Sequence, residues 1–470
     1  MRLRSAKILA TLGPASRAPK ILNLLHVAGV DAFRLNFSHG SHEDHARNVK
    51  TIRDIEKRTG QPITIVADMQ GPKLRCGQFK GGSIELKYGE TINIELGDGE
   101  GHGGHIYMPH PELMNTCVAG TILKFDDGKL QVTVLSNDGT TIKARIDVPG
   151  TLSDRKGINV INAVLPISAM TDKDRDDMAF ALSQNVDFIA LSFVQTKKDV
   201  TDARAIIGNK AGIIVKIEKP SAVENLDDIL EQADAAMVAR GDLGVELPLE
   251  QVPIVQRAII RKCRALGKPV IVATHMLESM IDAPTPTRAE ASDVATAIYQ
   301  GADTVMLSAE TAVGRHPATA VAIMDRIMRA VESDPEYWRY FRDVGLAYKS
   351  KPEDAISGAL SGIVDILDAK AILGYTTSGA TALRLSRVRP NSRILALTPH
   401  LKTARRLMLS WGLQAVVTED PSGFDDMLKM VESIAKSSLG LSKGDIVITV
   451  AGIPFGEGGS TNTLNISTLT

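Results

Sequence analysis

The sequence predicts an α/β fold: a (β/α)8 TIM barrel with an inserted all-β lid domain and a C-terminal open-sheet α/β domain. Three observations carry this prediction. Short apolar runs recur eight times within the first 310 residues, one gap between them is far longer than the others, and the pattern changes after about residue 348. Eight consecutive strand–helix units are the number that closes such a barrel.

Each of the eight runs is rich in apolar residues and carries glycine, serine, threonine or a charged residue towards its end. Near-continuous apolar runs are typical of parallel strands buried on both faces. Most runs start 23 to 34 residues apart, which leaves room for a turn and a helix, and the intervening stretches have helical periodicity. The runs are KILATLG from Lys7, AFRLNFSHG from Ala32, ITIVADMQ from Ile63, DFIALSFV from Asp187, GIIVKIE from Gly212, AAMVARGD from Ala235, PVIVATHM from Pro269 and DTVMLSAE from Asp303.

The third gap extends over 124 residues, from Ile63 to Asp187. One strand–helix unit takes about 30 residues, so about 90 are extra. These residues alternate between apolar and polar, with Asp-Gly and Gly-Gly turns, as antiparallel strands do. We predict an all-β domain at residues 76–159, inserted into a barrel formed by residues 1–75 and 160–347. An insertion here would lie at the carboxyl ends of the barrel strands, where a lid would sit.

Residues 348–470 are predicted to form a separate α/β domain. Strand-like apolar runs alternate there with amphipathic stretches, which is the pattern of an open α/β sheet. The helices that we expect are Ala355–Leu367, Thr403–Ser410 and Phe424–Ser438.

Charge and hydropathy exclude some classes of partner. The formal net charge is −1 and no long block has one sign, which argues against a nucleic-acid partner. No apolar run approaches the roughly 20 residues of a membrane span. The basic N-terminus has too short an apolar stretch for a signal peptide. We therefore expect a cytoplasmic protein without a nucleic-acid or membrane partner.

Two sets of residues could suggest redox or metal chemistry, but we interpret both as structural. Cys76, Cys117 and Cys263 lie far apart without metal-ligand spacing, so we expect reduced thiols. The segment HGSHEDH spaces three histidines to suit one face of a helix. Solvated polar helix residues are the preferred interpretation, and a zinc site is the alternative. The three are His39, His42 and His45.

One apolar strand, GIIVKIE, ends in charged residues, although charged side chains are seldom buried without a partner. Lys216 and Glu218 share one side of the strand because side chains alternate. At this end of a TIM-barrel strand they would face the active site. The next strand ends ARGDLGVE, which places Asp242 beside Glu218. Two carboxylates can hold one Mg²⁺, and a nearby lysine suits phosphoryl transfer; an ion pair that only fills the barrel is the structural alternative.

Other strand ends carry polar groups to the same face. Alternation places Arg34, Asn36 and Ser38 on one side of the second strand, and Gly241 would let the backbone approach an anion. Any one of these could be a capping or packing residue, but polar groups at six of eight strand ends are hard to explain by packing. The remaining strand ends carry Asp68, Thr274, Ser308 and Glu310.

Eight motifs stand along the chain in this order: LATLGPAS, RLNFSHG, QGPKLR, VKIEKP, ARGDLGVE, ATHMLESM, PTRAEASDVATAI and MLSAETA. With its inserted β domain and C-terminal α/β domain, the chain resembles the pyruvate kinase family over essentially its whole length. The resemblance implies transfer of a phosphoryl group from phosphoenolpyruvate to ADP, which gives pyruvate and ATP in the last step of glycolysis. It also implies Mg²⁺ or Mn²⁺ as cofactor, a lid that excludes water, and a homotetramer.

The resemblance further implies roles for individual residues. Lys216 would contact the transferring phosphoryl group and stabilise the enolate, and Glu218 and Asp242 would bind Mg²⁺. Arg34 would grip the phosphoryl group, the amides of Gly241 and Asp242 would hold the substrate carboxylate, and Thr274 would lie where enolpyruvate is protonated. The residues that would approach the nucleotide are Pro14, Asn36, His39 and Arg75.

Two positions depart from the usual family pattern. Many members need K⁺, which lies near the residues matching Asn36, Ser38 and Asp68, and they have a glutamate where this chain has Lys73. An ammonium could occupy the niche of K⁺, so the chain resembles the K⁺-independent, bacterial-type branch and we expect activity without K⁺. A Lys73 that only faces solvent at the lid is the alternative. His275 stands where glutamine is more usual and could alter the pH profile.

The C-terminal domain contains a candidate effector site in the segment TTSGAT, before a helix expected to begin near Thr381. Small hydroxyl residues, glycine and a helix N-terminus can make a phosphate site; an ordinary turn is the alternative. The family often binds an activating sugar phosphate there beneath the loop PFGEGGS, with charge from Arg384, Arg387 and Arg389. Fructose 1,6-bisphosphate, a hexose or pentose monophosphate, and AMP are the candidates. The site residues would be Thr376, Thr377, Ser378, Gly379, Ala380 and Thr381.

Two other function classes use similar parts. Mg²⁺-dependent lyases and mutases that act on phosphoenolpyruvate or oxaloacetate also place carboxylates at barrel strand ends, but they need no ADP. A non-catalytic sensor would keep only the C-terminal phosphate site. Intact Lys216, Glu218, Asp242 and Thr274 argue against the sensor.

Overall fold

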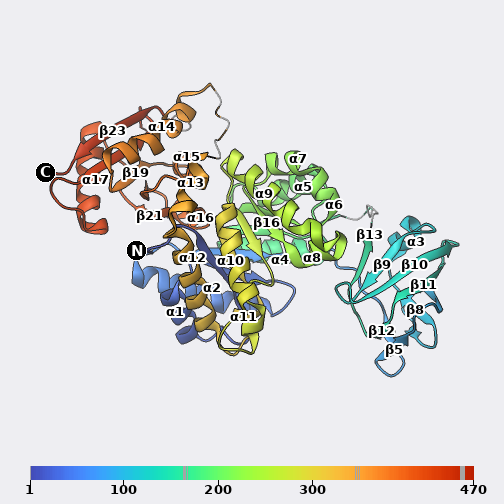
Figure 1. Cartoon of the computed structure of the whole chain (residues 1–470). Coiled ribbons are helices and arrows are strands. Elements are labelled where there is room, and N and C mark those ends of the chain that lie inside the picture. The colour runs from blue at the N-terminus through green and yellow to red at the C-terminus, as the bar shows by residue number, and fades with distance from the viewer. Residues whose placement is uncertain are drawn as a thin grey trace.

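The computed structural model describes residues 2–161, 166, 168–343, 346, 348, 350–455 and 461–470. Eight parallel strands close into a barrel in the order β1-β18-β17-β16-β15-β14-β3-β2, at the centre of Figure 1. The predicted barrel is confirmed, and each predicted run contains one of its strands. Their bounds are β1 Lys7–Thr11, β2 Ala32–Asn36, β3 Thr64–Asp68, β14 Phe188–Leu191, β15 Gly212–Ile217, β16 Ala235–Ala239, β17 Val270–Ala273 and β18 Thr304–Leu307.

Helices surround the barrel strands, and several begin at side-chain caps. Ser41, Thr171 and Thr287 each form a capping box with an acidic residue three positions later, which satisfies free amides at the helix start. The helices of this part are α1 Pro19–Ala28, α2 His42–Thr59, α4 Asp172–Ser183, α5 Lys197–Ile207, α6 Pro220–Glu224, α7 Leu226–Gln232, α8 Arg240–Glu246, α9 Val252–Leu266, α10 Arg288–Gln300, α11 Ala309–Ala312, α12 Pro317–Glu332 and α13 Pro335–Asp343, with 3₁₀ turns η1 Leu249–Gln251 and η2 Glu278–Ile281.

Alternate residues of the barrel strands point inward and form a packed centre. Leu9, Val66, Ile214, Met237 and Met306 belong to this inner cluster, and all are buried. Moving two residues along each strand brings the next inward side chain towards the carboxyl end. The polar residues predicted at the strand ends therefore lie above a dry apolar layer.

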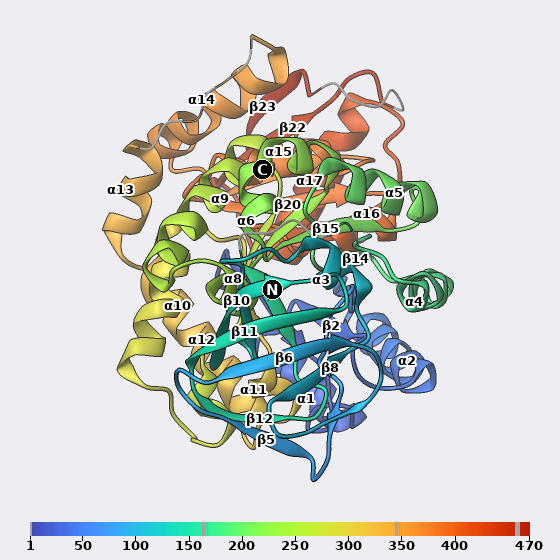
Figure 2. The same cartoon turned by 90° about the vertical axis from the view of Figure 1, so that its right-hand side faces the viewer.

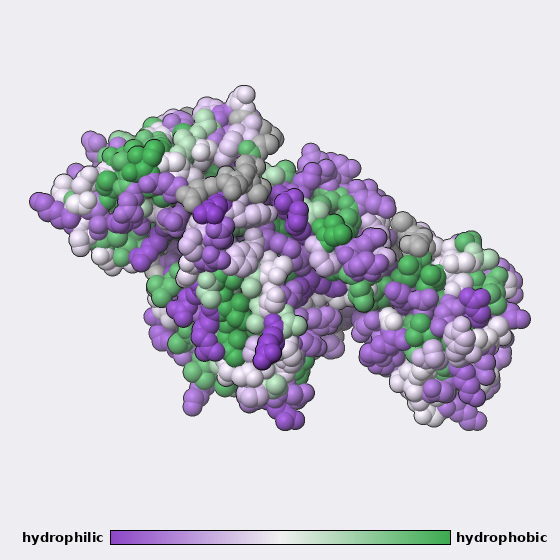
Figure 3. All heavy atoms as spheres, viewed as in Figure 1, coloured by the Kyte–Doolittle hydropathy of each residue, from purple (hydrophilic) through white to green (hydrophobic). Residues whose placement is uncertain are grey.

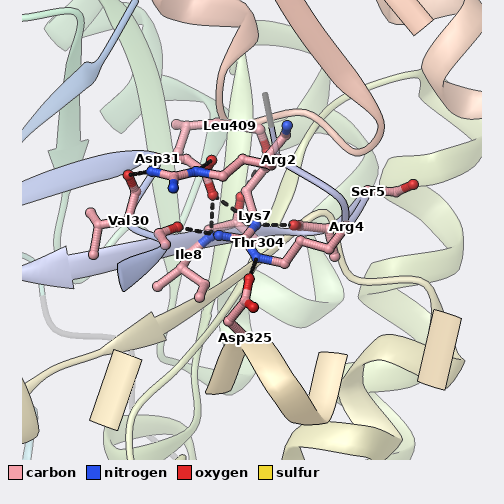
Figure 4. Close-up of polar contacts among 12 residues, drawn as sticks. Arg2, Arg4, Ser5, Lys7, Ile8, Val30, Asp31, Thr304, Asp325 and Leu409 are labelled. Carbon is pink, nitrogen blue, oxygen red and sulfur yellow. Dashed lines mark hydrogen bonds and ion pairs between the residues drawn. The ribbon is translucent and has the colours of Figure 1, made fainter. Parts of the chain in front are cut away.

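The C-terminal domain closes the amino-terminal end of the barrel. Leu409 joins the inner apolar cluster, and its carbonyl accepts a 2.8 Å hydrogen bond from Thr304 Oγ1. Lys7 Nζ donates to the carbonyl of Leu413 at 2.6 Å. Figure 4 shows Lys7, Thr304 and Leu409 together with Asp31 and the arginines around it. Only the carboxyl end of the barrel is thus left open for a site.

Lys7, at the closed amino-terminal end of the barrel, gives a prediction about how the stability of the fold depends on pH. Burial, opposed by Asp31 and reinforced by Arg4, lowers the pKa of Lys7 to about 8. Below pH 8 both folded and unfolded chains carry the proton, so the folded state bears the full cost of the buried charge. Between pH 8 and 10.5 the unfolded chain binds more protons, so stability rises with pH. Relative to Lys7→Met, the wild type should gain about 2 kcal/mol between pH 7.5 and 9.5.

The measurement is the midpoint of thermal unfolding of both proteins at the two pH values. Other groups that titrate in this range are shared, so they cancel in the difference between the proteins. Midpoints that shift in parallel for the wild type and Lys7→Met would show that Lys7 keeps an ordinary pKa.

The inserted domain is built mainly of antiparallel strands around its own apolar core. One sheet has the order β13-β9-β10-β11-β6-β8, and β12-β5 and β4-β7 form short pairs. The prediction of an all-β domain missed one helix, α3 Pro111–Thr116, which starts at a proline that suits a first helical turn. The strands are β4 Gln78–Phe79, β5 Ser83–Leu86, β6 Thr91–Leu96, β7 Glu100–Gly101, β8 His105–Met108, β9 Ile122–Phe125, β10 Leu130–Asn137, β11 Thr141–Val148, β12 Gly150–Ser153 and β13 Ile158–Ile161.

This domain projects from the carboxyl end of the barrel. Figure 2 shows it in front of the barrel when that side faces the viewer, and Figure 3 shows that it meets the barrel along a narrow contact. Its apolar core runs from Leu74 to Val160. Residues 76–159 stay our proposed bounds for the lid, between barrel segments 1–75 and 160–347.

The C-terminal domain is an open sheet in the order β21-β20-β19-β22-β23, in which β23 is antiparallel. The three predicted helices are present; α14 starts three residues earlier because Pro352 suits a first turn, and α16 ends three residues earlier. We propose 348–470 as its bounds. The elements are α14 Pro352–Leu367, β19 Ala371–Tyr375, α15 Ala380–Arg387, β20 Arg393–Thr398, α16 Leu401–Leu407, β21 Leu413–Val417, α17 Phe424–Leu439, β22 Ile446–Ala451 and β23 Thr463–Thr468. Within the described ranges, no helix is long and apolar enough to span a membrane.

Candidate active site

Lys216 stands at the centre of the open end of the barrel. Its ammonium lies 2.8 Å from Glu218 Oε1 and 3.4 Å from Asp68 Oδ1, and it donates a 2.7 Å hydrogen bond to Ser192 Oγ. The side chain is only 11% exposed. Strand alternation brings Lys216 and Glu218 to one side of the chain, as the sequence predicts, and the carboxyl end of β3 adds Asp68.

Asp68 holds a second cation beside the first. Arg34 Nε lies 2.6 Å from Asp68 Oδ2, and Arg34 Nη1 donates to Thr11 Oγ1 at 3.1 Å. The sequence interpretation placed Asp68 at a polar strand end and in the region of a K⁺ site. In the structure its carboxylate bridges Arg34 and Lys216, so it fixes the position of both positive charges.

Burial and mutual attraction set the charges of this network. Burial opposes the ammonium of Lys216, but Asp68 and Glu218 outweigh it and raise the pKa of Lys216. Burial likewise opposes ionisation of Asp68, yet Lys216 and Arg34 lower its pKa. Burial raises the pKa of Glu218 to about 7 against the pull of Lys216, and the negative charge of Asp242 adds to the increase.

Asp242 lies in a helix rather than on a strand. Strand β16 ends at Ala239, and the chain enters α8 directly, so Asp242 occupies the first helical turn. The Gly241 amide donates a 2.8 Å hydrogen bond to Thr274 Oγ1. A Cβ on Gly241 would stand 3.3 Å from that oxygen, so glycine permits the close approach of the two chains.

Thr274 and His275 both adopt left-handed backbone conformations, with φ of 68° and 54°. Such conformations cost about 1–3 kcal/mol each and tend to occur at functional sites. Arg240 holds this segment, because its Nη2 donates to the carbonyl of Thr274 at 2.7 Å and its Nη1 pairs with Asp293 at 2.7 Å. Sequence reasoning missed Arg240, although it stands directly after a strand end.

Ser192 and Phe193 were also missed. Ser192 accepts from Lys216 and donates to the carbonyl of Met69 at 2.8 Å, and the Phe193 amide donates to Glu218 Oε2 at 2.7 Å. The run DFIALSFV places Ser192 at the end of a strand, as the other candidates are placed. The strand-end rule could therefore have found it.

The predicted nucleotide residues separate into two places. Pro14, Asn36 and His39 line one cavity of about 360 Å³. Arg75 does not line it; its Nη1 donates to the carbonyl of Arg155 at 3.1 Å, at the junction of barrel and lid. In this structure Arg75 is thus part of the lid connection.

Lys73 also lies at the lid junction. Its ammonium is 3.8 Å from Asp127 Oδ1 in the lid and is partly exposed. Among the described residues, no hydrogen bond or ion pair joins Lys73 to Asn36, Ser38 or Asp68. The backbone amide of Ser38 instead donates to Asn36 Oδ1 at 3.1 Å.

One strand-end residue and one histidine differ from expectation. Glu310 is buried and accepts from the amides of Leu277 and Ser308, at 3.0 and 2.7 Å, so it braces loops rather than facing a substrate. His45 is buried and stacks on Phe37, with ring centres 4.2 Å apart, so it is not a solvated residue. Cys76, Cys117 and Cys263 are buried free thiols, as predicted.

The lid contacts the last turn of α8. Lys124 Nζ donates to the carbonyl of Val245 at 2.7 Å, and Asn159 Nδ2 donates to Glu246 Oε1 at 2.9 Å. Glu246 also pairs with Lys219 at 2.9 Å. The helix that carries Asp242 in its first turn is therefore held by the lid at its other end.

The effector candidate has the expected loop-to-helix geometry. The Gly379 amide donates to Thr376 Oγ1 at 2.9 Å, and Thr381 Oγ1 lies 2.9 Å from Thr461 Oγ1. Arg384 also donates to Thr461, at 3.1 Å. Arg389 is not near this loop; it pairs with Asp303 of the barrel. Most of the predicted covering loop, residues 456–460, lies outside the described residues.

A TIM barrel whose open end carries two buried cations among buried carboxylates defines a class of enzymes that act on anionic substrates at the strand ends. Comparison with models of protein families then identifies the family within this class. A model described as "pyruvate kinase, barrel domain" matches residues 3–321, and one described as "pyruvate kinase, alpha/beta domain" matches residues 354–467. The chain belongs to the pyruvate kinase family, whose phosphotransferases convert phosphoenolpyruvate and ADP to pyruvate and ATP.

Relatives cover the whole chain. A pyruvate kinase of Methylorubrum extorquens is 46% identical over 473 residues, which cover 100% of this chain and 98% of the relative. One from Agrobacterium vitis is 46% identical over 98% of this chain and 96% of its own length. A solved pyruvate kinase from Cryptosporidium parvum is 34% identical, with a TM-score of 0.93 over 99% of this chain and 96% of that one.

Proposed function

We propose that the chain transfers the phosphoryl group of phosphoenolpyruvate to ADP at the mouth of the barrel, in a reaction that depends on Mg²⁺ or Mn²⁺. The observation that carries the proposal is the buried network of Arg34, Asp68, Lys216 and Glu218, with ion pairs of 2.6 to 3.4 Å. Phosphoryl transfer is catalysed mainly by positioning and charge stabilisation. Two cations held in a dry site supply both.

Glu218 and Asp242 fit a magnesium site in their chemistry. Glu218 Oε1 is buried and makes no hydrogen bond to the described residues, apart from its ion pair with Lys216. No cluster of three or more ligating side chains occurs in the described part of the chain. Mg²⁺ is often bound by one or two carboxylates together with substrate oxygens and water, so a pair is sufficient. When bound, the cation would neutralise charge on the phosphoryl group.

The chain's own groups would position the substrate. Arg34 and Lys216 would hold the phosphoryl oxygens, while Asp68 keeps the two cations in place. The amides of Gly241 and Asp242 would bind the substrate carboxylate. Thr274 Oγ1 now accepts from the Gly241 amide and donates to the carbonyl of Ala273 at 2.8 Å. To pass a proton, through water, to enolpyruvate, this hydroxyl would turn from the carbonyl towards the substrate.

Removal of the divalent cation tests this proposal. With EDTA present, formation of pyruvate from phosphoenolpyruvate and ADP should fall to background, and Mg²⁺ or Mn²⁺ should restore it. The rate should also need ADP. Full activity in EDTA would refute the metal proposal. Metal-dependent consumption of phosphoenolpyruvate without ADP would favour a lyase or mutase, and binding without turnover would favour a sensor.

We further propose that K⁺ is not required, with Lys73 as the internal cation. The resemblance to the K⁺-independent branch supports this. Because Lys73 now pairs with Asp127 of the lid, its ammonium would have to leave that partner when the lid closes. Rates in K⁺ and in tetramethylammonium should be similar, whereas Lys73→Glu should lose activity without K⁺ and regain it with K⁺. A wild-type rate that collapses without K⁺ would refute the proposal.

The remaining parts of the proposal follow from the family resemblance. ADP would bind in the cavity lined by Pro14, Asn36 and His39. The loop at residues 376–381 would bind a sugar phosphate or AMP as activator, since the Arg384 guanidinium lies beside Thr381 and Thr461. The chain would act as a cytoplasmic homotetramer in the last step of glycolysis.

A further inference from the structure

A second cavity lies where the barrel meets the C-terminal domain, far from the strand ends that carry Lys216. Its volume is about 350 Å³, within the range of small-molecule sites. Barrel helices α9 and α13 supply Arg264, Trp338 and Phe341, and the C-terminal domain supplies α14 and the segment after α15. The wall is therefore partly aromatic and partly cationic.

Arg264 is a buried cation without an acidic partner. It is 6% exposed, its Nε donates to the carbonyl of Arg387 at 3.0 Å, and its guanidinium lies 4.7 Å from the centre of the Phe341 ring. No ion pair to Arg264 occurs among the described residues. Buried charges are normally paired. Burial, together with the nearby charge of Arg389, lowers the pKa of Arg264 to about 10, so it stays charged at neutral pH.

Arg389 adds a second guanidinium to the same wall. One side of it is paired, because Nη2 lies 3.1 Å from Asp303 and donates to the carbonyl of Gly301 at 3.0 Å. Among the described residues, nothing accepts a hydrogen bond from its Nε or Nη1, although only 3% of the residue is exposed. Its φ of 53° is unfavourable before a proline. Arg389 thus places a second positive charge beside Arg264, although its backbone conformation is energetically unfavourable.

Helix α14 leaves space in front of these arginines. Gly358, Ser361 and Gly362 face the cavity, and a Cβ added to Gly362 would meet nothing within 4 Å. Glycine weakens a helix interior relative to alanine. Gly362 borders open space, whereas a Cβ on Gly358 would approach the Tyr348 ring at 3.2 Å, so this second glycine makes room for the ring. Asp365 of the same helix also lines the cavity. Because its carboxylate would repel an anion, the anionic group of a ligand is expected next to the arginines rather than next to α14.

We propose that this cavity binds a small organic anion, a carboxylate or phosphate carried on a flat apolar group, with Arg264 holding the anionic group. A guanidinium can donate two parallel hydrogen bonds to either group. The Phe341 and Trp338 rings would pack against the flat part. A ligand here would touch both the barrel and the C-terminal domain and would stabilise their junction by mass action.

Tryptophan fluorescence of the full-length protein tests the proposal. The chain has two tryptophans, and both report on this place: Trp338 lines the cavity, and Trp411 stacks under Arg389 at 4.7 Å. Titration with phenyl phosphate or benzoate should give a saturable change. Inorganic phosphate and phenol should each bind at least tenfold more weakly. Whichever of phenyl phosphate and benzoate binds more tightly identifies the anionic group of the ligand as phosphate or carboxylate.

Three variants locate the binding. Arg264→Met should weaken it at least tenfold, and Arg261→Met, an exposed arginine of the same helix, should leave it unchanged. Gly362→Leu should fill the cavity and also abolish binding without altering a charge, which covers the case in which Arg264→Met fails to fold. Unchanged affinity in Gly362→Leu, or no saturable change with any probe, would overturn the proposal.

Discussion

Replacing Lys216 by methionine should lower kcat for pyruvate formation at least about a thousandfold. Loss of one preorganised electrostatic contact to a reacting group typically costs 10²–10³ in rate, and Lys216 is the most central cation of the site. Methionine keeps the length and apolar body of the side chain but removes the charge. Initial rates at saturating phosphoenolpyruvate, ADP and Mg²⁺ measure the effect.

Lys219→Met is the matched control for this variant. Lys219 is also buried and ion-paired, three residues along the chain, but its partner is Glu246 rather than the network around Asp68. Its replacement should cost less than about tenfold in kcat. Because Lys216→Met leaves buried carboxylates unpaired, its thermal midpoint must be shown to lie above the assay temperature. Equal rates for Lys216→Met and the wild type would exclude Lys216 from the chemistry.

Replacing Glu218 by glutamine should weaken Mn²⁺ binding at least about a hundredfold. Mutation of a residue that only hydrogen-bonds to a metal ligand typically lowers metal affinity 10- to 100-fold, and loss of a direct ligand should lower it at least as much. Glutamine has nearly the same shape but lacks the negative charge. Titration calorimetry with Mn²⁺ measures binding directly, and the Mg²⁺ concentration for half-maximal rate should rise in parallel.

Glu246→Gln serves as the control for the metal prediction. Glu246 is a buried carboxylate of the same region, but it accepts from Lys219 and from Asn159 of the lid. Its replacement should leave Mn²⁺ affinity within a few-fold of the wild type. If both variants lose affinity equally, the loss reflects a disturbed α8 rather than a lost ligand.

The sequence predicts the barrel well because its signal is local. Each barrel strand is a short apolar run, and most of these runs start 23 to 34 residues apart. Side-chain alternation alone places Lys216 and Glu218 on one side of their strand. The same rule placed Asp68 at a strand end but could not show that it bridges Arg34 and Lys216. That contact joins three strands, and their register is a property of the closed barrel.

Positions that depend on the lid or on packing were predicted less well. Arg75 and Lys73 follow a strand end, yet the connection to the lid draws them towards Arg155 and Asp127. Glu310 carries a charge at a strand end, but its carboxylate is used by two backbone amides. Sequence patterns show which side chains reach the mouth of the barrel. They do not show which of these side chains are already bonded to other parts of the chain.

The most direct test of the proposed mechanism is a count of ATP and pyruvate formed per phosphoenolpyruvate consumed, in Mg²⁺ and ADP, with tetramethylammonium in place of K⁺. We expect one ATP and one pyruvate for each phosphoenolpyruvate, and no consumption when ADP or Mg²⁺ is omitted. Pyruvate formed without ATP, or consumption that continues without ADP, would contradict phosphoryl transfer to the nucleotide at this site.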